Sequence, residues 1–295
     1  MTDRDRPFPA LPMRWRLVVG GLGALVLVFG IGVSAQSATR KATAQNINAI
    51  TLAAQCGDTI KATDEFPAPI IVKSRPTCPV TLDLTDATVT SMRFVGASNW
   101  TVKGGTFTGA RFIAVQVIGS DHLKFLNGTY RNYGNAGISL LNSSFIIVQG
   151  NSFSDANADG VDVVSSQDIE FRNNSCSLSY TQKLHADCLQ IWNKPGNPLT
   201  VARVIADGNK CFGRMQCIVT FGAGDPRPIS GITITNNYAH IRTKWGGQIN
   251  APGPVCLECK MRGNVAETYP GMPPSWERPG WYNGRRAEPG NTNGK

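Results

Sequence analysis

The chain has 295 residues, of which 41% are hydrophobic and 17% are charged, and its formal net charge is +9. The apolar fraction is enough for a core and excludes a wholly disordered chain, while the low charge and the 31 glycines favour short strands and turns over long exposed helices. The basic charge is compatible with polyanion binding and equally with a merely soluble surface. All-β proteins often use about 200 to 250 residues as one domain, so one or two domains remain open.

The first 35 residues have the composition of an export signal or an N-terminal anchor. Four arginines between Arg4 and Arg16 precede an uncharged stretch over residues 17–33, and the small residues at 33–35 suit a signal peptidase. The stretch also reaches the lower length limit for spanning a bilayer, so an uncleaved anchor is the alternative. In either case we expect a secreted, periplasmic or cell-surface protein whose membrane contact is confined to this segment.

Residues 36–55 are expected to form a linker with a capping helix near 47–54, ahead of a repeated region over 56–266. Seven segments of that region run from an alternating apolar strand into a Gly/Asn pair, at spacings of 23, 23, 23, 35, 28 and 27 residues. Apolar residues recur at every second position, which predicts a solenoid of strands. Coils stack about 4.8 Å apart, so a column of Asn side chains can hydrogen-bond along the axis. The aligned column contains Gly105, Gly128, Asn151, Asn174, Asn209, Asn237 and Asn264.

The residue two places after each ladder position is expected to point inward. This second column begins with Phe107, Tyr130 and Phe153 and continues with Cys176 and Cys211. With its Asn ladder and near-23-residue coil, the chain resembles the right-handed parallel β-helix proteins of the pectate-lyase-like superfamily (the pectin lyase fold), over roughly residues 56–266. We therefore expect an all-β protein: one right-handed parallel β-helix of about eight coils, with an N-terminal cap and a Pro/Gly-rich tail over 267–295.

The eight cysteines are interpreted as disulfides, because an exported chain favours disulfides over a zinc site. The alignment stacks two pairs of cysteines one coil apart, within the Cα separation that a disulfide needs. We therefore predict the pairs Cys176–Cys211 and Cys188–Cys217, with Cys56–Cys78 in the cap and Cys256–Cys259 as a local pair.

Acidic residues gather where the repeat lengthens, and long loops on a rigid scaffold are where sites tend to lie. Asp159 and Asp187 share a column on neighbouring coils, and Ser139, Asp162 and Gln190 form the next outward column. Two close carboxylates must share a proton, bind a cation or face solvent. Aspartates that cap turns are the alternative. The sequence predicts Asp159, Asp162 and Asp187 as a Ca²⁺ or carboxylate site that grips a uronate, or, without metal, as carboxylates that activate water for hydrolysis.

Two motif resemblances bear on the reaction. The run 157–160, Asn-Ala-Asp-Gly, resembles the Asn-Thr-Asp-Gly motif of polygalacturonase-type hydrolases, and Asp187-Cys188-Leu189 resembles the end of their Gly-Asp-Asp motif. In that family the first Asp of the pair supplies the general acid; Ala186 stands there in this chain, which argues against ordinary inverting hydrolysis unless His185 substitutes. The string 185–190 is similar to the His-Pro-Asp-x-Ile-Gln pattern of secreted bacterial β-helix proteins grouped with polysaccharide lyases.

These patterns favour an exported enzyme that acts on an acidic polysaccharide, more by β-elimination than by hydrolysis. A polygalacturonase-type hydrolase and a non-catalytic glycan-binding or surface scaffold protein remain as alternatives. We expect a monomer without nucleic-acid binding, since no basic run with interleaved aromatics occurs within the coils. His185 is the predicted base or acid, because imidazole titrates near neutral pH. The predicted substrate-binding residues are Asp162, Lys183, Gln190, Trp192, Arg214, Arg242, Lys244 and Trp245.

Overall fold

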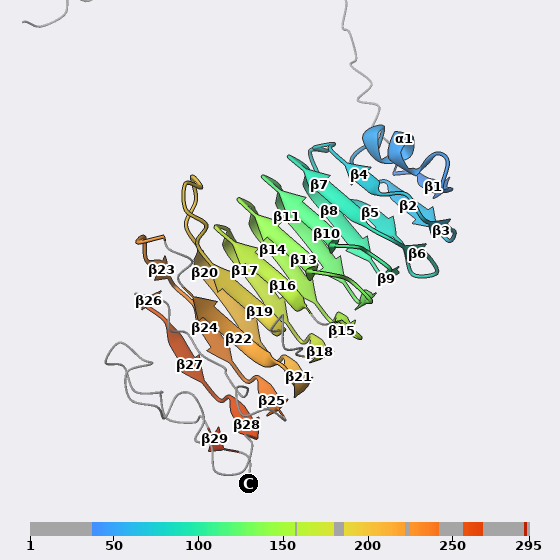
Figure 1. Cartoon of the computed structure of the whole chain (residues 1–295). Coiled ribbons are helices and arrows are strands. Elements are labelled where there is room, and N and C mark those ends of the chain that lie inside the picture. The colour runs from blue at the N-terminus through green and yellow to red at the C-terminus, as the bar shows by residue number, and fades with distance from the viewer. Residues whose placement is uncertain are drawn as a thin grey trace, which may run out of the picture. The chain divides into compact units, whose positions relative to one another are not determined.

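The computed structural model describes residues 37–156, 158–179, 186–221, 225–241, 256–267 and 292–293. Within these ranges the chain forms short β-strands and one α-helix, α1 (Ile47–Leu52), close to the expected capping helix. None of the described helical structure is long and apolar enough to cross a membrane. The strands stack coil upon coil in sequence order, as the colours of Figure 1 show.

Three parallel sheets run along the stack, and each coil visits them in the order A, B, C. Sheet A contains β1 (Thr39–Ala42), β2 (Thr59–Ala62), β5 (Val80–Asp83), β8 (Ser98–Lys103), β11 (Asp121–Leu126), β14 (Ser144–Gln149), β17 (Gln167–Arg172), β20 (Ala202–Asp207), β23 (Ile229–Ser230), β24 (Thr233–Thr235), β26 (Cys256–Leu257) and β27 (Lys260–Arg262). Sheet B contains β3 (Glu65–Phe66), β6 (Thr88–Val89), β9 (Thr106–Thr108), β12 (Thr129–Arg131), β15 (Ser152–Ser154), β18 (Ser175–Ser179), β21 (Lys210–Arg214), β25 (Tyr238–Ile241), β28 (Val265–Glu267) and β29 (Thr292–Asn293). Sheet C contains β4 (Ile70–Val72), β7 (Met92–Val95), β10 (Ile113–Ile118), β13 (Ala136–Leu141), β16 (Asp159–Val164), β19 (Asp187–Trp192) and β22 (Gln216–Phe221).

This arrangement is a parallel β-helix, which confirms the expected fold class. The period-two pattern puts one face of each strand into a continuous apolar core, as in β8, where Trp100 and Val102 are buried. The predicted inward column is also present, because the rings of Phe107, Tyr130 and Phe153 stack at centroid distances of 4.7 and 4.8 Å. Equivalent core residues of neighbouring coils therefore touch along the axis and hold the coils together.

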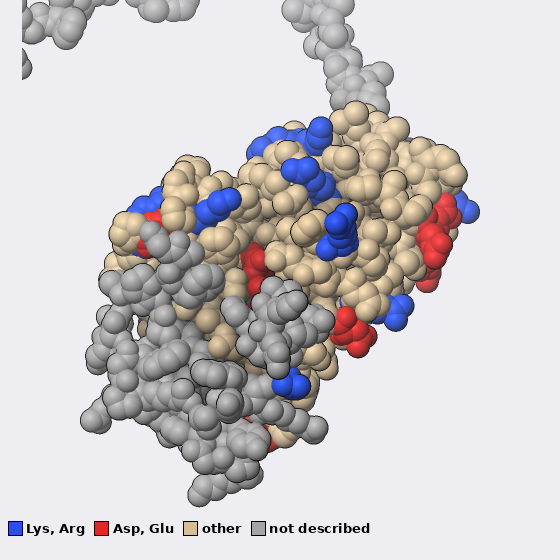
Figure 2. Space-filling model, in the orientation of Figure 1, with Lys and Arg blue, Asp and Glu red and all other residues tan. Residues whose placement is uncertain are grey.

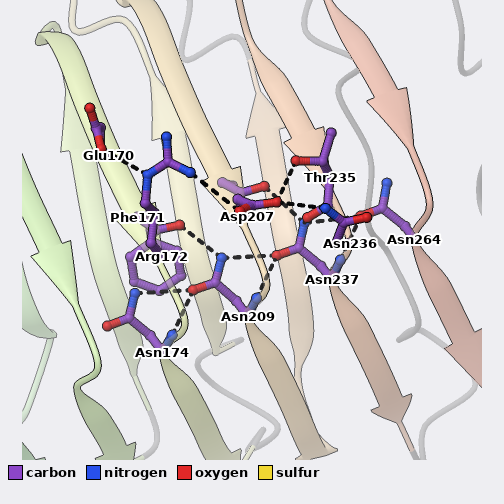
Figure 3. Close-up of polar contacts among 11 residues, drawn as sticks. Glu170, Phe171, Arg172, Asn174, Asp207, Asn209, Thr235, Asn236, Asn237 and Asn264 are labelled. Atoms are coloured by element: carbon purple, nitrogen blue, oxygen red, sulfur yellow. Dashed lines mark hydrogen bonds and ion pairs between the residues drawn. The ribbon is translucent and has the colours of Figure 1, made fainter.

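The predicted Asn ladder forms the corner between sheets A and B, and Figure 3 shows its central part. The side-chain oxygen of Asn209 accepts from the backbone N–H of Asn174 at 2.9 Å and from its Nδ2 at 3.0 Å. Asn209 in turn donates its own Nδ2 to the carbonyl of Phe171 and to Oδ1 of Asn237, both at 2.9 Å. Each asparagine thus satisfies buried backbone groups that the turn leaves without a strand partner.

A second ladder, of serines, forms the corner between sheets C and A. Ser143 Oγ accepts from the backbone N–H of Ser120 at 3.2 Å, and Ser166 Oγ accepts from the N–H of Ser143 at 3.1 Å. Both hydroxyls donate to a carbonyl two residues earlier. The 23-residue spacing of Ser120, Ser143 and Ser166 is visible in the sequence, although we did not predict this ladder.

Two of the four predicted disulfides are wrong. Cys56–Cys78 and Cys256–Cys259 are present, but the central cysteines pair as Cys176–Cys188 and Cys211–Cys217. The predicted register itself is right, because Cys176 lies opposite Cys211 in the pairing of β18 with β21. Side chains stacked on parallel strands point the same way, whereas Cys176 and Cys188 face each other across the corner between sheets B and C, 5.6 Å apart at Cα. The Cys176–Cys188 and Cys211–Cys217 disulfides therefore each close a corner within one coil. The presence of disulfides agrees with an oxidising compartment.

Strand pairing extends beyond the predicted limits of the β-helix at both ends. Strand β1 pairs with β2 from Thr39 onward, inside the segment expected to be a linker. Strand β29 pairs with β28 and so adds residues of the Pro/Gly-rich tail to sheet B. Sheet C has seven strands and sheet B ten in the described residues, so the expected eight coils fall between the two counts.

Candidate active site on sheet C

The two insertions that lengthen the repeat flank strand β19. Val163 of β16 pairs with Ile191, an interval of 28 residues, whereas Ile169 of β17 pairs with Val204, an interval of 35. The extra residues therefore enter both before and after β19. The strand that carries Asp187 and Gln190 is therefore flanked on both sides by inserted residues, which is where sites on a rigid scaffold tend to lie.

Three carboxyl groups meet at the start of β16 and β19, and we call Asp159, Asp162 and Asp187 the carboxyl cluster. Oδ1 of Asp159 accepts the backbone N–H of Asp187 at 2.8 Å, which ties the two coils together. The side chains of Asp159 and Asp162 also share a hydrogen bond. Gln190 Nε2 donates to Oδ2 of Asp187 at 2.8 Å. The predicted column of Ser139, Asp162 and Gln190 is present in the register.

Burial sets the protonation of the cluster. Asp187 is fully buried and Asp162 is 6% exposed, while Asp159 is partly exposed. Desolvation, together with the adjacent charges of Asp162 and Asp187, raises the pKa of Asp159 to about 10. Asp159 is therefore protonated at neutral pH. A carboxylic acid held neutral and partly open to solvent can act as a proton donor.

Tyr133 is a further residue of the site that the sequence did not point to. Its side chain is 4% exposed, and its hydroxyl has no hydrogen-bond partner among the described residues. Burial and the charges of Asp159 and Asp162 hold the pKa of Tyr133 well above its usual value. The only available signal was its position three residues after the ladder-associated Tyr130, at the entrance to β13.

The arrangement does not fit a calcium ion. One oxygen of Asp159 and one of Asp187 already accept hydrogen bonds from the protein. The described ranges contain no group of three or more His, Cys, Asp or Glu side chains placed to hold a metal ion. Calcium needs several oxygen ligands directed at one point, so no catalytic step is derived through it here.

The remaining predicted site residues are less close to the cluster or lie outside the described residues. Trp192 is half-buried at the end of β19, and Arg214 is exposed at the end of β21. On the face shown in Figure 2, the described Lys and Arg side chains are scattered among uncharged atoms. Five predicted residues fall outside the described ranges: Lys183, His185, Arg242, Lys244 and Trp245.

Comparison with known families agrees with this architecture. The family described as right-handed β-helix region matches residues 84–242, more than half of the chain. Comparison with curated proteins finds no match.

Three solved structures illustrate the range of similar proteins. The alginate lyase of Paenibacillus sp. strain FPU-7 is 16% identical, with 77% of this chain and 86% of that chain covered and a TM-score of 0.49. The adhesin PfbA of Streptococcus pneumoniae is 12% identical over 72% and 73% of the two chains, with a TM-score of 0.43. The A-module of the mannuronan C-5 epimerase AlgE6 of Azotobacter vinelandii is 11% identical over 77% and 63%, with a TM-score of 0.36.

Proposed function

We propose, from the premise that this chain belongs to the right-handed β-helix family, that its carboxyl cluster processes a uronate-containing polysaccharide by β-elimination. The observation that carries the proposal is the partly exposed Asp159 beside two buried carboxyl groups, which raise its pKa. The charges of the two buried aspartates beside it, Asp162 and Asp187, add to desolvation in raising the pKa of Asp159.

The chemistry assigns one step to Asp159. In β-elimination a base removes the proton from the carbon that bears the uronate carboxyl, a carbon–carbon double bond forms, and the glycosidic carbon–oxygen bond breaks. The leaving oxygen then needs a proton, which Asp159 supplies as general acid. His185 remains the predicted base. Arg214 remains a predicted substrate-binding residue, and its guanidinium is suited to the uronate carboxylate.

Asp187 takes a different role from the one that we predicted from sequence. It is fully buried and receives a hydrogen bond from Gln190, so it acts through Asp159 and does not contact substrate. Its charge is one of the causes that raise the pKa of Asp159. Asp187 is therefore a positioning residue.

Two alternatives each have an observation in their favour. Hydrolysis also needs a general acid, and the same protonated Asp159 would serve it. A non-catalytic scaffold is favoured by the hydrogen bond from the Asp187 backbone to Asp159, because that contact also joins two coils structurally.

The deciding experiment incubates the protein with a panel of uronate polysaccharides, with added Ca²⁺ and separately with a chelator. Elimination is expected to yield both new reducing ends and the ultraviolet absorbance of an unsaturated uronate, at rates that the chelator leaves unchanged. Reducing ends without the absorbance would assign hydrolysis. Loss of turnover on chelation that Ca²⁺ restores would reinstate the calcium site. If no glycan yields either signal, the proposal that the protein is an enzyme is wrong.

A further inference from the structure

A groove of about 600 Å³ lies on the outer face of sheet A, a different sheet from the one that carries the carboxyl cluster. Its floor is a single register column that crosses neighbouring coils: Thr101, Lys124, Ile147, Glu170, Ile205 and Thr233. Coils rise about 4.8 Å each, so the column is about 24 Å long. The groove is therefore long and straight and runs along the helix axis.

One wall of the groove is a column of residues with left-handed backbone. His122, Phe145 and Asp168 have φ of 53°, 55° and 56°. None of the three has a partner in the strand pairing, so its side chain does not follow the inward–outward alternation of the strand. Each side chain lines the groove instead. The coil geometry imposes this conformation on every residue of the column, and Asn or Gly adopt it most easily.

Phe145 is the member of this wall that the fold does not explain. A bulky aromatic residue is a rare occupant of left-handed backbone, and Phe145 is not part of the core, because its side chain is 50% exposed. Its ring stacks on that of His122 at a centroid distance of 4.7 Å, and His122 Nδ1 lies 2.8 Å from Asp121 Oδ1. The ring pair is thus held in place at the surface, where strain of this kind points to a binding role.

Among the described residues, two acidic and two basic side chains line the groove: Asp168, Glu170, Lys124 and Arg203. Asp168 receives two hydrogen bonds from Arg203, at 2.6 and 2.7 Å, and Glu170 is paired with Arg172 at 2.8 Å. Lys124 is exposed and has no acidic partner among the described residues. The groove therefore complements an anion near Lys124, next to the ring pair.

We propose that this groove binds an acidic polysaccharide strand laid along the helix axis, with Lys124 holding a sugar carboxylate and Phe145 with His122 contacting the sugar rings. A linear chain of rings fits a straight groove of this length. The polar residues at the two ends of the column, Thr101 and Thr233, are suited to sugar hydroxyls. The site goes beyond the proposed reaction, because it would anchor a glycan on sheet A whether or not sheet C is catalytic.

The test measures calorimetric affinity for oligogalacturonate, oligomannuronate and a neutral glucan oligosaccharide. The protein carries Asp159→Asn throughout, so that turnover cannot interfere. We expect Phe145→Asn to weaken the preferred oligouronate at least tenfold while leaving the melting temperature equal or higher, because Asn accepts left-handed backbone more easily. Lys124→Gln should weaken the acidic ligand several-fold and reduce the salt dependence. The matched control is Phe112→Ala, which removes an aromatic side chain that is 66% exposed and lies outside the groove.

Three outcomes would overturn the proposal. Unchanged affinity in Phe145→Asn would show that the ring pair does not contact the glycan. A large fall in its melting temperature would make Phe145 a structural residue. Dissociation of a dimer by Phe145→Asn, with glycan affinity unchanged, would assign the groove to a second copy of the chain. Binding that depends on Phe145, in a protein without turnover on any polysaccharide, would refute only the proposed reaction.

Discussion

Replacing Asn209 by alanine should lower the free energy of unfolding by about 3 to 5 kcal/mol, the largest stability effect that we expect from a single ladder side chain. The side chain is fully buried and makes hydrogen bonds in both directions along the axis. Its loss leaves the N–H of Asn174 and the carbonyl of Phe171 without these partners in a site that water cannot easily reach. Urea unfolding measures the change directly.

The matched control for the ladder is Asn135→Ala. Asn135 is exposed, and its side chain makes none of the hydrogen bonds seen in the described residues. Removing it should change stability by less than about 0.5 kcal/mol. Equal and small effects at Asn135 and Asn209 would mean that the ladder does not stabilise the coil stack, and that core packing alone sets its stability.

Replacing Asp159 by asparagine should reduce turnover by about 100- to 10,000-fold on any polysaccharide that the wild-type protein cleaves. Asparagine keeps the size of the side chain and can still accept the Asp187 N–H, but it cannot give up a proton to the leaving oxygen. Stability should be equal or higher, because the substitution removes a buried acid from beside two carboxyl groups. Initial rates and thermal unfolding of the same preparation measure both effects.

Two further variants separate catalysis from structure. Asp155→Asn changes an exposed carboxyl on the same coil, outside the cluster, and should leave the rate unchanged. Asp187→Asn should move the alkaline limb of the pH–rate profile to lower pH, because it removes one of the charges that raise the pKa of Asp159.

Full turnover in Asp159→Asn would rule out Asp159 as the acid.

The fold could be predicted from sequence because its main determinants repeat. The 23-residue interval and the column ending at Asn264 specify the register of many strand pairs at once, and the structure has that register. The serine ladder that begins at Ser120 has the same 23-residue interval, but serine is common in turns of any kind, so its recurrence does not by itself predict a ladder. The disulfides could not be predicted from the strand register alone. The register correctly placed Cys176 beside Cys211, but disulfide pairing depends on the direction of each side chain. Cys188, on the next sheet, faces Cys176 and bonds to it.

The site could be predicted only in part. Alignment brought Asp159, Asp162 and Asp187 together, but it did not show how deeply each is buried, and the pKa of Asp159 depends on its desolvation together with the charges of the other two. The groove on sheet A could not be predicted from the alternation of apolar and polar residues along the strands. Left-handed backbone at Phe145 takes its side chain out of the alternation, and such a break appears only once the coil geometry is known.

The most direct test of a proton donor in the carboxyl cluster is the difference in unfolding free energy between wild type and Asp159→Asn as a function of pH. Because the folded pKa is about 10 and the unfolded value near 4, the folded wild type binds the extra proton between these pH values. Its stability should therefore fall as pH rises through that window, by up to about 1.4 kcal/mol per pH unit relative to the variant. A difference that stays constant from about pH 5 to about pH 9 would mean that Asp159 is ionised at neutral pH, and would contradict its role as the acid.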